Sequence, residues 1–301
     1  MMRNSSLKKV VTVILALLCM NGAMAQNISF SRETFCFGNI TLPYRKADIS
    51  GVEDKASLVV YLHGGSSKGN DNEIQITEPA VNSISMWLAA NRHKAVMLVP
   101  QCPKDKSWMG AMLGGVKALV RQYVDKGVVD GSKVYIFGGS MGGTGTWNML
   151  SSFPGLFAAA MPVAGNPSGL DAEKVAQTPL YTVMGTADAI MDISTVETFL
   201  SEMEAYHASY HYDVEQGWTH EDVCKNSYTD ERLAWVFAHA QGEIDDISAV
   251  EDAKDHVFST VWYDLTGNIL NGAPQLNAQG IYIKRMVFDN GRMQSEKVIV
   301  R

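Results

Sequence analysis

The sequence Gly-Gly-Ser-Met-Gly at residues 138–142 has the residue types and spacing that most directly indicate chemistry. It fits the pattern G-x-S-x-G, in which a sharp turn from a strand into a helix exposes a serine hydroxyl at the edge of a sheet. The pattern by itself also fits an ordinary glycine-rich turn. Here an apolar run at 133–137 ends just before it and a helical pattern begins just after it, as the chemistry requires. We therefore predict that Ser140 is a nucleophile.

A serine nucleophile on such a turn needs a carboxylate later in the chain, because the acid orients the histidine that takes the serine proton. Asp188 follows the predicted strand 179–184 and stands on the loop at its carboxyl end. The alternative, Asp192, directly precedes an amphipathic run, a position typical of a helix N-cap. We predict that Asp188 is the acid.

The histidine base is expected after the acid in the chain. Five histidines follow Asp188. Four of them lie within or at the end of a predicted helix or strand, or beyond the predicted catalytic domain: His207, His211, His239 and His256. His220 alone falls on a loop just after the last predicted strand, where the alternative is a surface histidine. We predict that His220 is the base.

The developing oxyanion of an acyl-transfer reaction needs hydrogen-bond donors. The predicted strand 56–62 ends in His63-Gly64-Gly65, a form of loop that donates one backbone N–H, and the residue after the nucleophile donates the other. We predict the N–H groups of Gly65 and Met141 as these donors, with Ser66 as the alternative to Gly65. His63 precedes the serine in the chain, so we expect it to shape the turn.

The elements that must position these residues alternate between strand and helix. Short apolar runs occur at 56–62, 95–100, 133–137, 158–163, 179–184 and 210–215. Helical patterns lie at 79–91, 111–126, 141–152, 192–208 and 228–239. Continuous apolar strands that alternate with helices are typical of a parallel sheet covered on both faces. The predicted class is α/β, a mostly parallel sheet with helices on both faces.

Together these residues resemble the α/β-hydrolase superfamily over nearly all of 56–240. The resemblance is to secreted esterase-like members grouped with phospholipase/carboxylesterase, dienelactone-hydrolase-like and predicted-peptidase sequences. It depends on the His-Gly-Gly loop, on Val-Pro-Gln-Cys-Pro at 99–103 followed by Trp108, and on the His220 loop continuing to Tyr228 and Trp235. It implies hydrolysis of carboxylic esters through an acyl-serine intermediate. In that group a tryptophan often stands four residues after the histidine, where this chain has Cys224.

Substrate preference is indicated by what the loops contain. The segment 164–178, where lipases of this fold insert a lid, is short, so we expect an open cleft suited to esters on a polymer. Trp108 and Trp218 stand on predicted loops at the catalytic edge and could stack on a sugar ring or an aromatic acyl group; the alternative is that both pack the loops. Cys102 and Cys224 are predicted at the same edge, where they could form a disulfide.

The two ends of the chain differ from the rest. Residues 1–25 have a positive start, an apolar run and Ala-Met-Ala before Gln26, which predicts a secretory signal peptide. We predict a catalytic domain over 26–243 and a small β-rich domain over 244–301. Segments such as Trp-Tyr-Asp-Leu-Thr-Gly at 262–267 resemble the C-terminal sorting domain of the type IX secretion system of the Bacteroidetes. The resemblance implies contact with secretion machinery and a secreted or cell-surface protein, with the periplasm as the alternative.

Composition excludes several classes of function. The formal charge is −7, with no block of five or six like charges, so we expect no nucleic-acid partner. No stretch after the signal is long enough to span a membrane. No CxxC or HExxH spacing supports a metal site, and no cofactor is expected. The sequence thus predicts a secreted serine esterase acting on acetyl or feruloyl esters of plant polysaccharides. The alternatives are a serine peptidase of the same fold and a non-catalytic surface glycan-binding protein.

Overall fold

The computed structural model describes residues 28–241, 257–264, 269–270, 280–288 and 293–300. The predicted signal peptide, residues 1–25, and the predicted boundary near residue 243 lie outside the described residues. The described strands form two sheets, one of eight strands and one of four.

The eight-stranded sheet has the strand order β1-β2-β4-β3-β5-β6-β7-β8. Its strands are β1 (Ser31–Phe37), β2 (Ile40–Ile49), β3 (Ala56–Leu62), β4 (Ala95–Pro100), β5 (Val129–Gly139), β6 (Ala159–Val163), β7 (Leu180–Gly185) and β8 (Tyr210–Glu215). All pairings from β4 to β8 are parallel, whereas β1 and β2 pair antiparallel with each other and β2 pairs antiparallel with β4. The predicted mostly parallel α/β sheet is confirmed.

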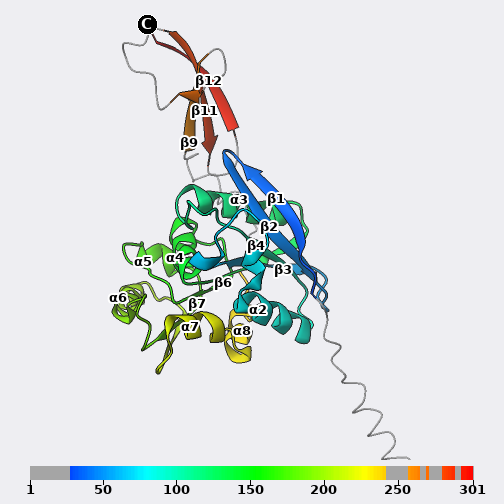
Figure 1. The fold of residues 1–301 in the computed structure, drawn as a ribbon, viewed down its shortest axis with the longest axis vertical. Helices are drawn as coiled ribbons and strands as arrows, with labels where there is room; N and C mark the ends of the chain where they lie inside the picture. The colour runs from blue at the N-terminus through cyan, green and yellow to red at the C-terminus, as the bar shows by residue number, and fades with distance from the viewer. Residues whose placement is uncertain (1–27, 242–256, 265–268, 271–279, 289–292, 301) are drawn as a thin grey trace, which may run out of the picture.

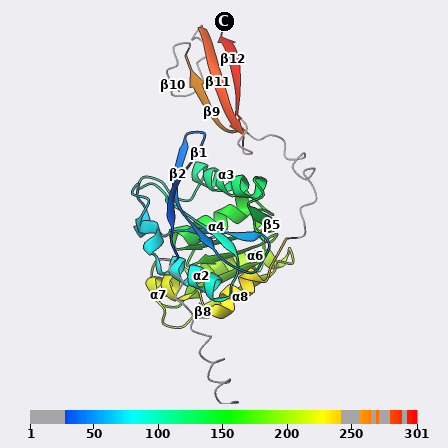
Figure 2. The ribbon, with the colours of Figure 1, turned by 90° about the vertical axis from the view of Figure 1, so that its right-hand side faces the viewer.

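Helices cover both faces of this sheet (Figure 1, Figure 2). They are α2 (Pro79–Ala90), α3 (Ala111–Asp125), α4 (Met141–Ser152), the short α5 (Ala172–Val175), α6 (Ile193–Glu204), α7 (His220–Asn226) and α8 (Asp230–Phe237). Two short 3₁₀ turns, η1 (Gly65–Ser67) and η2 (Ile74–Thr77), precede α2. The buried side chains of α3, α4, α5 and α6 belong to one core layer, and those of α2, α7 and α8 to the other.

The central strand β3 shows how the sequence produces the two layers. Successive side chains of a strand point to opposite faces, so an apolar run can fill both layers at once. Leu58, Val60 and Leu62 pack in the layer with α3 and α4, while Val59 and Tyr61 pack in the layer with α2. Every residue of β3 is buried, so the strand is covered by both layers along its whole length.

The edge hairpin β1–β2 was not among the predicted elements. Its burial alternates along β2, because one face of this edge strand packs on the core and the other is exposed. Gly38, with φ of 56°, forms the turn between the strands. The strands extend the sheet beyond β4 and do not contribute to the predicted site.

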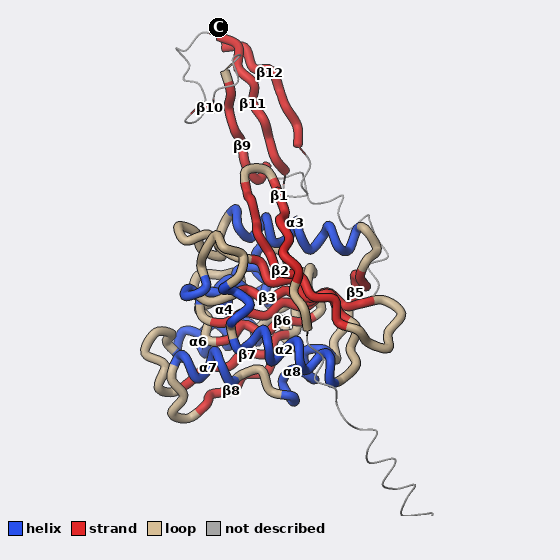
Figure 3. The backbone as a smooth tube through the Cα atoms, turned by 45° about the vertical axis from the view of Figure 1, so that its right-hand side comes forward, coloured by secondary structure: helices blue, strands red, loops and turns tan. Residues whose placement is uncertain are grey.

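The second sheet consists of β9 (Val257–Tyr263), β10 (Ile269–Leu270), β11 (Gly280–Phe288) and β12 (Met293–Val300). All its pairings are antiparallel, and β11 lies between β9 and β12 (Figure 3). The predicted β-rich character of the C-terminal segment is therefore confirmed. Among the described residues, no helix is long and apolar enough to cross a membrane.

Candidate active site

Ser140 lies on a sharp turn between β5 and α4. Its φ of 57° and ψ of −119° are unusual for any residue other than glycine, and it serves as the N-cap of α4. Backbone strain of this kind costs about 1–3 kcal/mol and concentrates at functional sites. The turn is held on both sides, because the N–H of Ser140 donates to the carbonyl of Val163 (3.0 Å) and its carbonyl accepts from Thr144 (2.9 Å).

The glycines around Ser140 are required by close backbone approach. A β-carbon at Gly138 would lie 2.3 Å from the carbonyl oxygen of Gly142. One at Gly142 would lie 1.8 Å from the carbonyl oxygen of Leu62 at the end of β3. Gly138 and Gly142 therefore let the start of α4 pack directly on the sheet, where any side chain would displace it.

The strain at Ser140 gives a prediction about stability. Both Ser140→Gly and Ser140→Ala remove the hydroxyl, but only glycine adopts this φ without strain. We expect the glycine variant to be more stable than the alanine variant by about 1 kcal/mol. Urea unfolding of the two purified variants measures the difference. Equal stabilities would contradict a strained turn.

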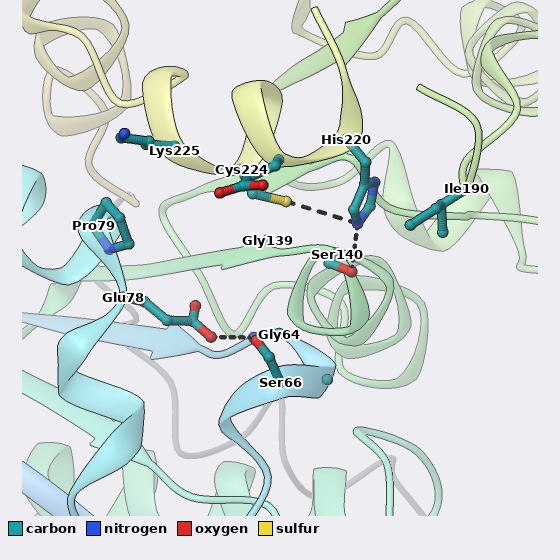
Figure 4. A pocket seen from close by; sticks show the side chains of 12 residues that line it. Gly64, Ser66, Glu78, Pro79, Gly139, Ser140, Ile190, His220, Cys224 and Lys225 are labelled. Carbon is teal, nitrogen blue, oxygen red and sulfur yellow. Dashed lines mark hydrogen bonds between the residues drawn. The ribbon is translucent and has the colours of Figure 1, made fainter. Parts of the chain in front are cut away.

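The imidazole of His220 lies beside the Ser140 hydroxyl (Figure 4), and its other ring nitrogen contacts Asp188. Nε2 of His220 is 2.7 Å from Oγ of Ser140, and Nδ1 is 2.8 Å from Oδ2 of Asp188. Both bonds form when Nδ1 carries the proton, because Nδ1–H then donates to the carboxylate and Nε2 accepts the serine proton. The structure thus brings together the three residues predicted from the sequence.

Local structure fixes the positions of Asp188 and His220. Oδ1 of Asp188 accepts from the N–H groups of Ile190 (2.8 Å) and Met191 (2.9 Å), and its side chain has no exposed surface. His220 is the first residue of α7, so the prediction that it stands on a loop was wrong by one residue. Thr219 caps this helix in a capping box with Asp222, and this cap fixes the backbone of His220 at the first helical position. Asp192 caps α6, as its position predicted.

The loop after β3 approaches the serine from the other side. His63 is buried; its Nδ1–H donates to the carbonyl of Gly64 (2.7 Å) and its Nε2 accepts from the N–H of Cys102 (2.9 Å). It therefore shapes the turn. Gly65 begins η1 and Met141 begins α4, and the N–H of a first helical residue has no acceptor within its own helix. Both predicted oxyanion donors thus begin helical turns beside Ser140.

The chain is similar in sequence and in fold to known hydrolases. Residues 89–263, more than half of the chain, match the family model described as the dienelactone hydrolase family. The chain belongs to the dienelactone hydrolase family. Among curated proteins, this family member is 30% identical over 112 residues to a bifunctional acetylxylan esterase/xylanase from Neocallimastix patriciarum. The match covers 37% of the chain and 15% of that enzyme.

Solved structures similar to this dienelactone hydrolase family member include several esterases. A thermostable esterase is 25% identical, with a TM-score of 0.60 over 70% of the chain and 63% of that protein. The feruloyl esterase module from Clostridium thermocellum, complexed with sinapinate, is 14% identical, with a TM-score of 0.58 over 71% and 90%. A putative dienelactone hydrolase from Klebsiella pneumoniae is 17% identical, with a TM-score of 0.54 over 71% and 99%. The last two similarities establish the α/β-hydrolase fold.

A cavity of about 450 Å³ opens beside Ser140. Its lining includes the predicted residues Gly65, Ser140 and His220. It also includes residues that the sequence did not single out, namely Glu78, Pro79, Ile190, Glu221 and Lys225. Two short signals could have found part of this set: Glu78 precedes the proline that begins α2, and Glu221 and Lys225 follow His220 on α7.

The two tryptophans predicted to bind substrate do not line this cavity. Trp108 is 1% exposed; its indole N–H donates to the carbonyl of His63 (3.0 Å) and its ring packs edge-on against the imidazole. No surface of Trp108 is left for a substrate, so the prediction for this residue was wrong. Trp218 is half-buried and packs against the core layer that contains α7.

Cys102 and Cys224 are both free thiols, so the predicted disulfide is absent. Cys102 is buried behind His63, whose Nε2 accepts its N–H. Cys224 lines the cavity, with Sγ 3.9 Å from Nε2 of His220. Burial raises the pKa of the Cys224 thiol to about 12, so it stays protonated beside Ser140. Cys224, which replaces the tryptophan found in the esterase-like sequences, therefore lines the pocket as an uncharged side chain.

Burial of His63 predicts a pH dependence of stability. Burial lowers the pKa of His63 below its usual value of 6.5 in the folded chain, because a charged imidazole would be poorly solvated there. The native state then binds fewer protons than the unfolded state. The contribution of His63 to the free energy of unfolding is therefore fully present above about pH 6.5, and it is lost as the pH falls toward and through the lowered pKa. The loss is about 1.4 kcal/mol for each pH unit of that shift.

Urea unfolding at pH 7.5 and 5.0 tests this dependence. We expect His63→Gln to narrow the difference in free energy of unfolding between the two pH values. Burial also lowers the pKa of His93, so this residue contributes separately to the difference in free energy of unfolding between the two pH values. The variant His93→Gln is the matched control, because it removes the contribution of His93 and leaves that of His63. A His63→Gln variant with the same pH dependence as the wild type would contradict the assignment.

No cluster of three or more histidine, cysteine or acidic side chains suited to a metal occurs within the described parts of the chain.

Proposed function

We propose that this protein is an exported serine esterase that hydrolyses carboxylic esters through an acyl-serine intermediate. The substrates are acetyl or feruloyl groups carried by plant polysaccharides. The observation that carries the proposal is the continuous hydrogen-bonded chain from Ser140 through His220 to Asp188 at a strained turn. Such a chain activates a hydroxyl that is otherwise a weak nucleophile.

In this mechanism Oγ of Ser140 attacks the ester carbonyl while Nε2 of His220 takes the hydroxyl proton. Asp188 holds the imidazole in the required tautomer and stabilises the imidazolium. The carbonyl oxygen becomes an oxyanion held by the N–H groups of Gly65 and Met141. His220 then returns the proton to the leaving alcohol. Water attacks the acyl-serine by the same steps in reverse order, which releases the acid and restores Ser140.

The names of the relatives support the substrate class. The curated relative is a bifunctional acetylxylan esterase/xylanase, and one structural relative is a feruloyl esterase module. The cavity of about 450 Å³ has room for an acetyl or a hydroxycinnamoyl group.

The experiment is release of acetate and of ferulate from arabinoxylan, with p-nitrophenyl acetate as a general ester and a peptide p-nitroanilide as the amide. We expect cleavage of p-nitrophenyl acetate and release of one or both acids. Cleavage of p-nitrophenyl acetate without release of either acid would contradict the proposal that the substrate is a polysaccharide ester. Amide cleavage at a rate comparable to that of the ester would favour the peptidase alternative. An inert protein that binds xylan would favour the glycan-binding alternative.

We also propose that residues 1–25 direct export, that 26–243 form the catalytic domain, and that 244–301 act as a sorting segment. The antiparallel sheet over β9–β12 supports only the β-rich character of that segment. Expression in a host that has a type IX secretion system tests the proposed signal peptide and the proposed sorting segment separately. Mature protein beginning at Gln26 is expected, and deletion of 244–301 should retain it in the periplasm. A first residue other than Gln26, or unchanged export after the deletion, would contradict the corresponding part.

A further inference from the structure

Glu78 is an acidic residue in the wall of the cavity, and the mechanism above does not use it. It stands just before α2, where Pro79 is the first helical residue, and its side chain points toward the loop after β3 (Figure 4). A carboxylate near a developing oxyanion disfavours the reaction unless its own charge is satisfied. The groups that hydrogen-bond to the Glu78 carboxylate therefore matter for the reaction at Ser140.

Three donors satisfy the Glu78 carboxylate. Oε1 accepts from the N–H of Gly64 (2.9 Å) and from the hydroxyl of Ser67 (2.6 Å). Oε2 accepts from the hydroxyl of Tyr61 (2.6 Å), a buried residue of β3. Burial raises the pKa of Tyr61 well above its usual value, so the phenol remains a donor. One carboxylate thus ties together the end of β3, the start of the turn and its last residue.

These contacts determine which backbone N–H is available to the substrate. Oε1 holds Gly64 on one side of η1 and Ser67 on the other, so the turn that contains Gly65 is fixed at both ends. The N–H of Gly64 is engaged by Glu78, which leaves that of Gly65 to serve the oxyanion. A β-carbon at Gly64 would lie 3.5 Å from Oε1 of Glu78 and 3.7 Å from Cβ of Ser140. The held turn therefore lies directly against the nucleophile.

We propose that Glu78 is the positioning residue of the oxyanion hole: through its hydrogen bonds to Gly64, Ser67 and Tyr61 it aims the N–H of Gly65 at the substrate carbonyl. Glu78 contributes bonds, and its negative charge is not required. This inference rests on the proposed esterase function. It goes beyond that function because it assigns a role to a residue outside the hydrogen-bonded chain of Ser140, His220 and Asp188.

Two substitutions separate the bonds from the charge. Glu78→Gln keeps all three contacts, since its amide oxygen accepts from Gly64 and Ser67 and its amide group donates to the Tyr61 oxygen. Glu78→Ala removes them. We expect Glu78→Ala to lower kcat for p-nitrophenyl acetate by about 10–100-fold with KM changed less than about threefold, because the oxyanion interaction strengthens in the transition state. Glu78→Gln should stay within about threefold of wild type in kcat.

The matched control is Glu202→Gln, which removes an exposed carboxylate on α6 outside the cavity lining and should leave kcat unchanged. If Glu78→Ala fails to fold, Ser67→Ala replaces it, because it removes one of the two bonds to Oε1. A fall in kcat of about 3–10-fold at constant KM is then expected. Thermal unfolding of every variant establishes that folded protein is compared.

The outcomes distinguish this inference from the proposed function. A wild type that cleaves no ester refutes the proposed esterase. An active wild type whose Glu78→Ala variant, or Ser67→Ala variant in its place, keeps the same kcat overturns the positioning role. A Glu78→Gln variant as slow as Glu78→Ala also overturns it, because the charge would then be the cause. A fall confined to KM would assign Glu78 to substrate binding, which overturns the role as well.

Discussion

Replacing Ser140 with alanine is expected to lower kcat/KM for ester hydrolysis by about 10⁴-fold or more, because in the mechanism that we propose Ser140 forms the acyl intermediate. The remaining rate would come from binding and from the oxyanion donors alone. Alanine keeps the Cβ of the turn, so the backbone at Ser140 is altered little. The measurement uses both p-nitrophenyl acetate and an acetylated xylan, since surface histidines attack the activated ester slowly.

A Ser140→Ala protein that retains more than about one hundredth of the wild-type rate on acetylated xylan would contradict the assignment of Ser140 as the nucleophile. Thermal unfolding should show that the variant is folded.

The second large effect is expected for Asp188→Asn, which should lower kcat by about 10⁴-fold. The asparagine amide group can donate toward Nδ1 of His220 and so favours the tautomer that cannot accept the serine proton. The two backbone bonds from Ile190 and Met191 to the other side-chain oxygen remain, so the loop should stay in place. Comparing kcat at saturating ester measures the effect.

Asp192→Asn is the matched control for this substitution. Asp192 lies four residues along the same loop and caps α6 through the N–H of Ser194 (2.9 Å). Asparagine is an equally good N-cap, so we expect activity and stability close to wild type. If Asp192→Asn were the slower of the two variants, the acid would be Asp192 and the assignment of Asp188 would be wrong.

Much of this site could be predicted from the sequence because its chemistry depends on short local patterns. The G-x-S-x-G turn follows a buried strand, and the order serine, aspartate, histidine along the chain matches the order of the strand ends on which they stand. Parallel strands bring their carboxyl ends to one edge of the sheet, so three loops far apart in sequence meet there. The structure places Ser140, Asp188 and His220 within hydrogen-bond reach for this reason.

Other features depend on tertiary packing that local patterns do not encode. Trp108 lies in an irregular segment, and nothing in the sequence indicates that this segment packs beneath His63. Glu78 is marked in the sequence only by the proline that follows it, and the role that we propose for it depends on its contacts with β3 and η1. The start of α7 was a missed local signal, because Thr219 and Asp222 have the spacing of a capping box. The edge hairpin β1–β2 was missed because its strands are only half-buried.

Covalent labelling shows whether Ser140 is the activated nucleophile that we propose. The wild-type protein is incubated with a fluorophosphonate, and its intact mass and proteolytic peptides are measured. We predict one adduct per chain, on the peptide that contains Ser140, with loss of ester hydrolysis in proportion to labelling and no adduct in Ser140→Ala. An adduct on another residue, or full ester hydrolysis by a protein that takes up no label, would contradict the account.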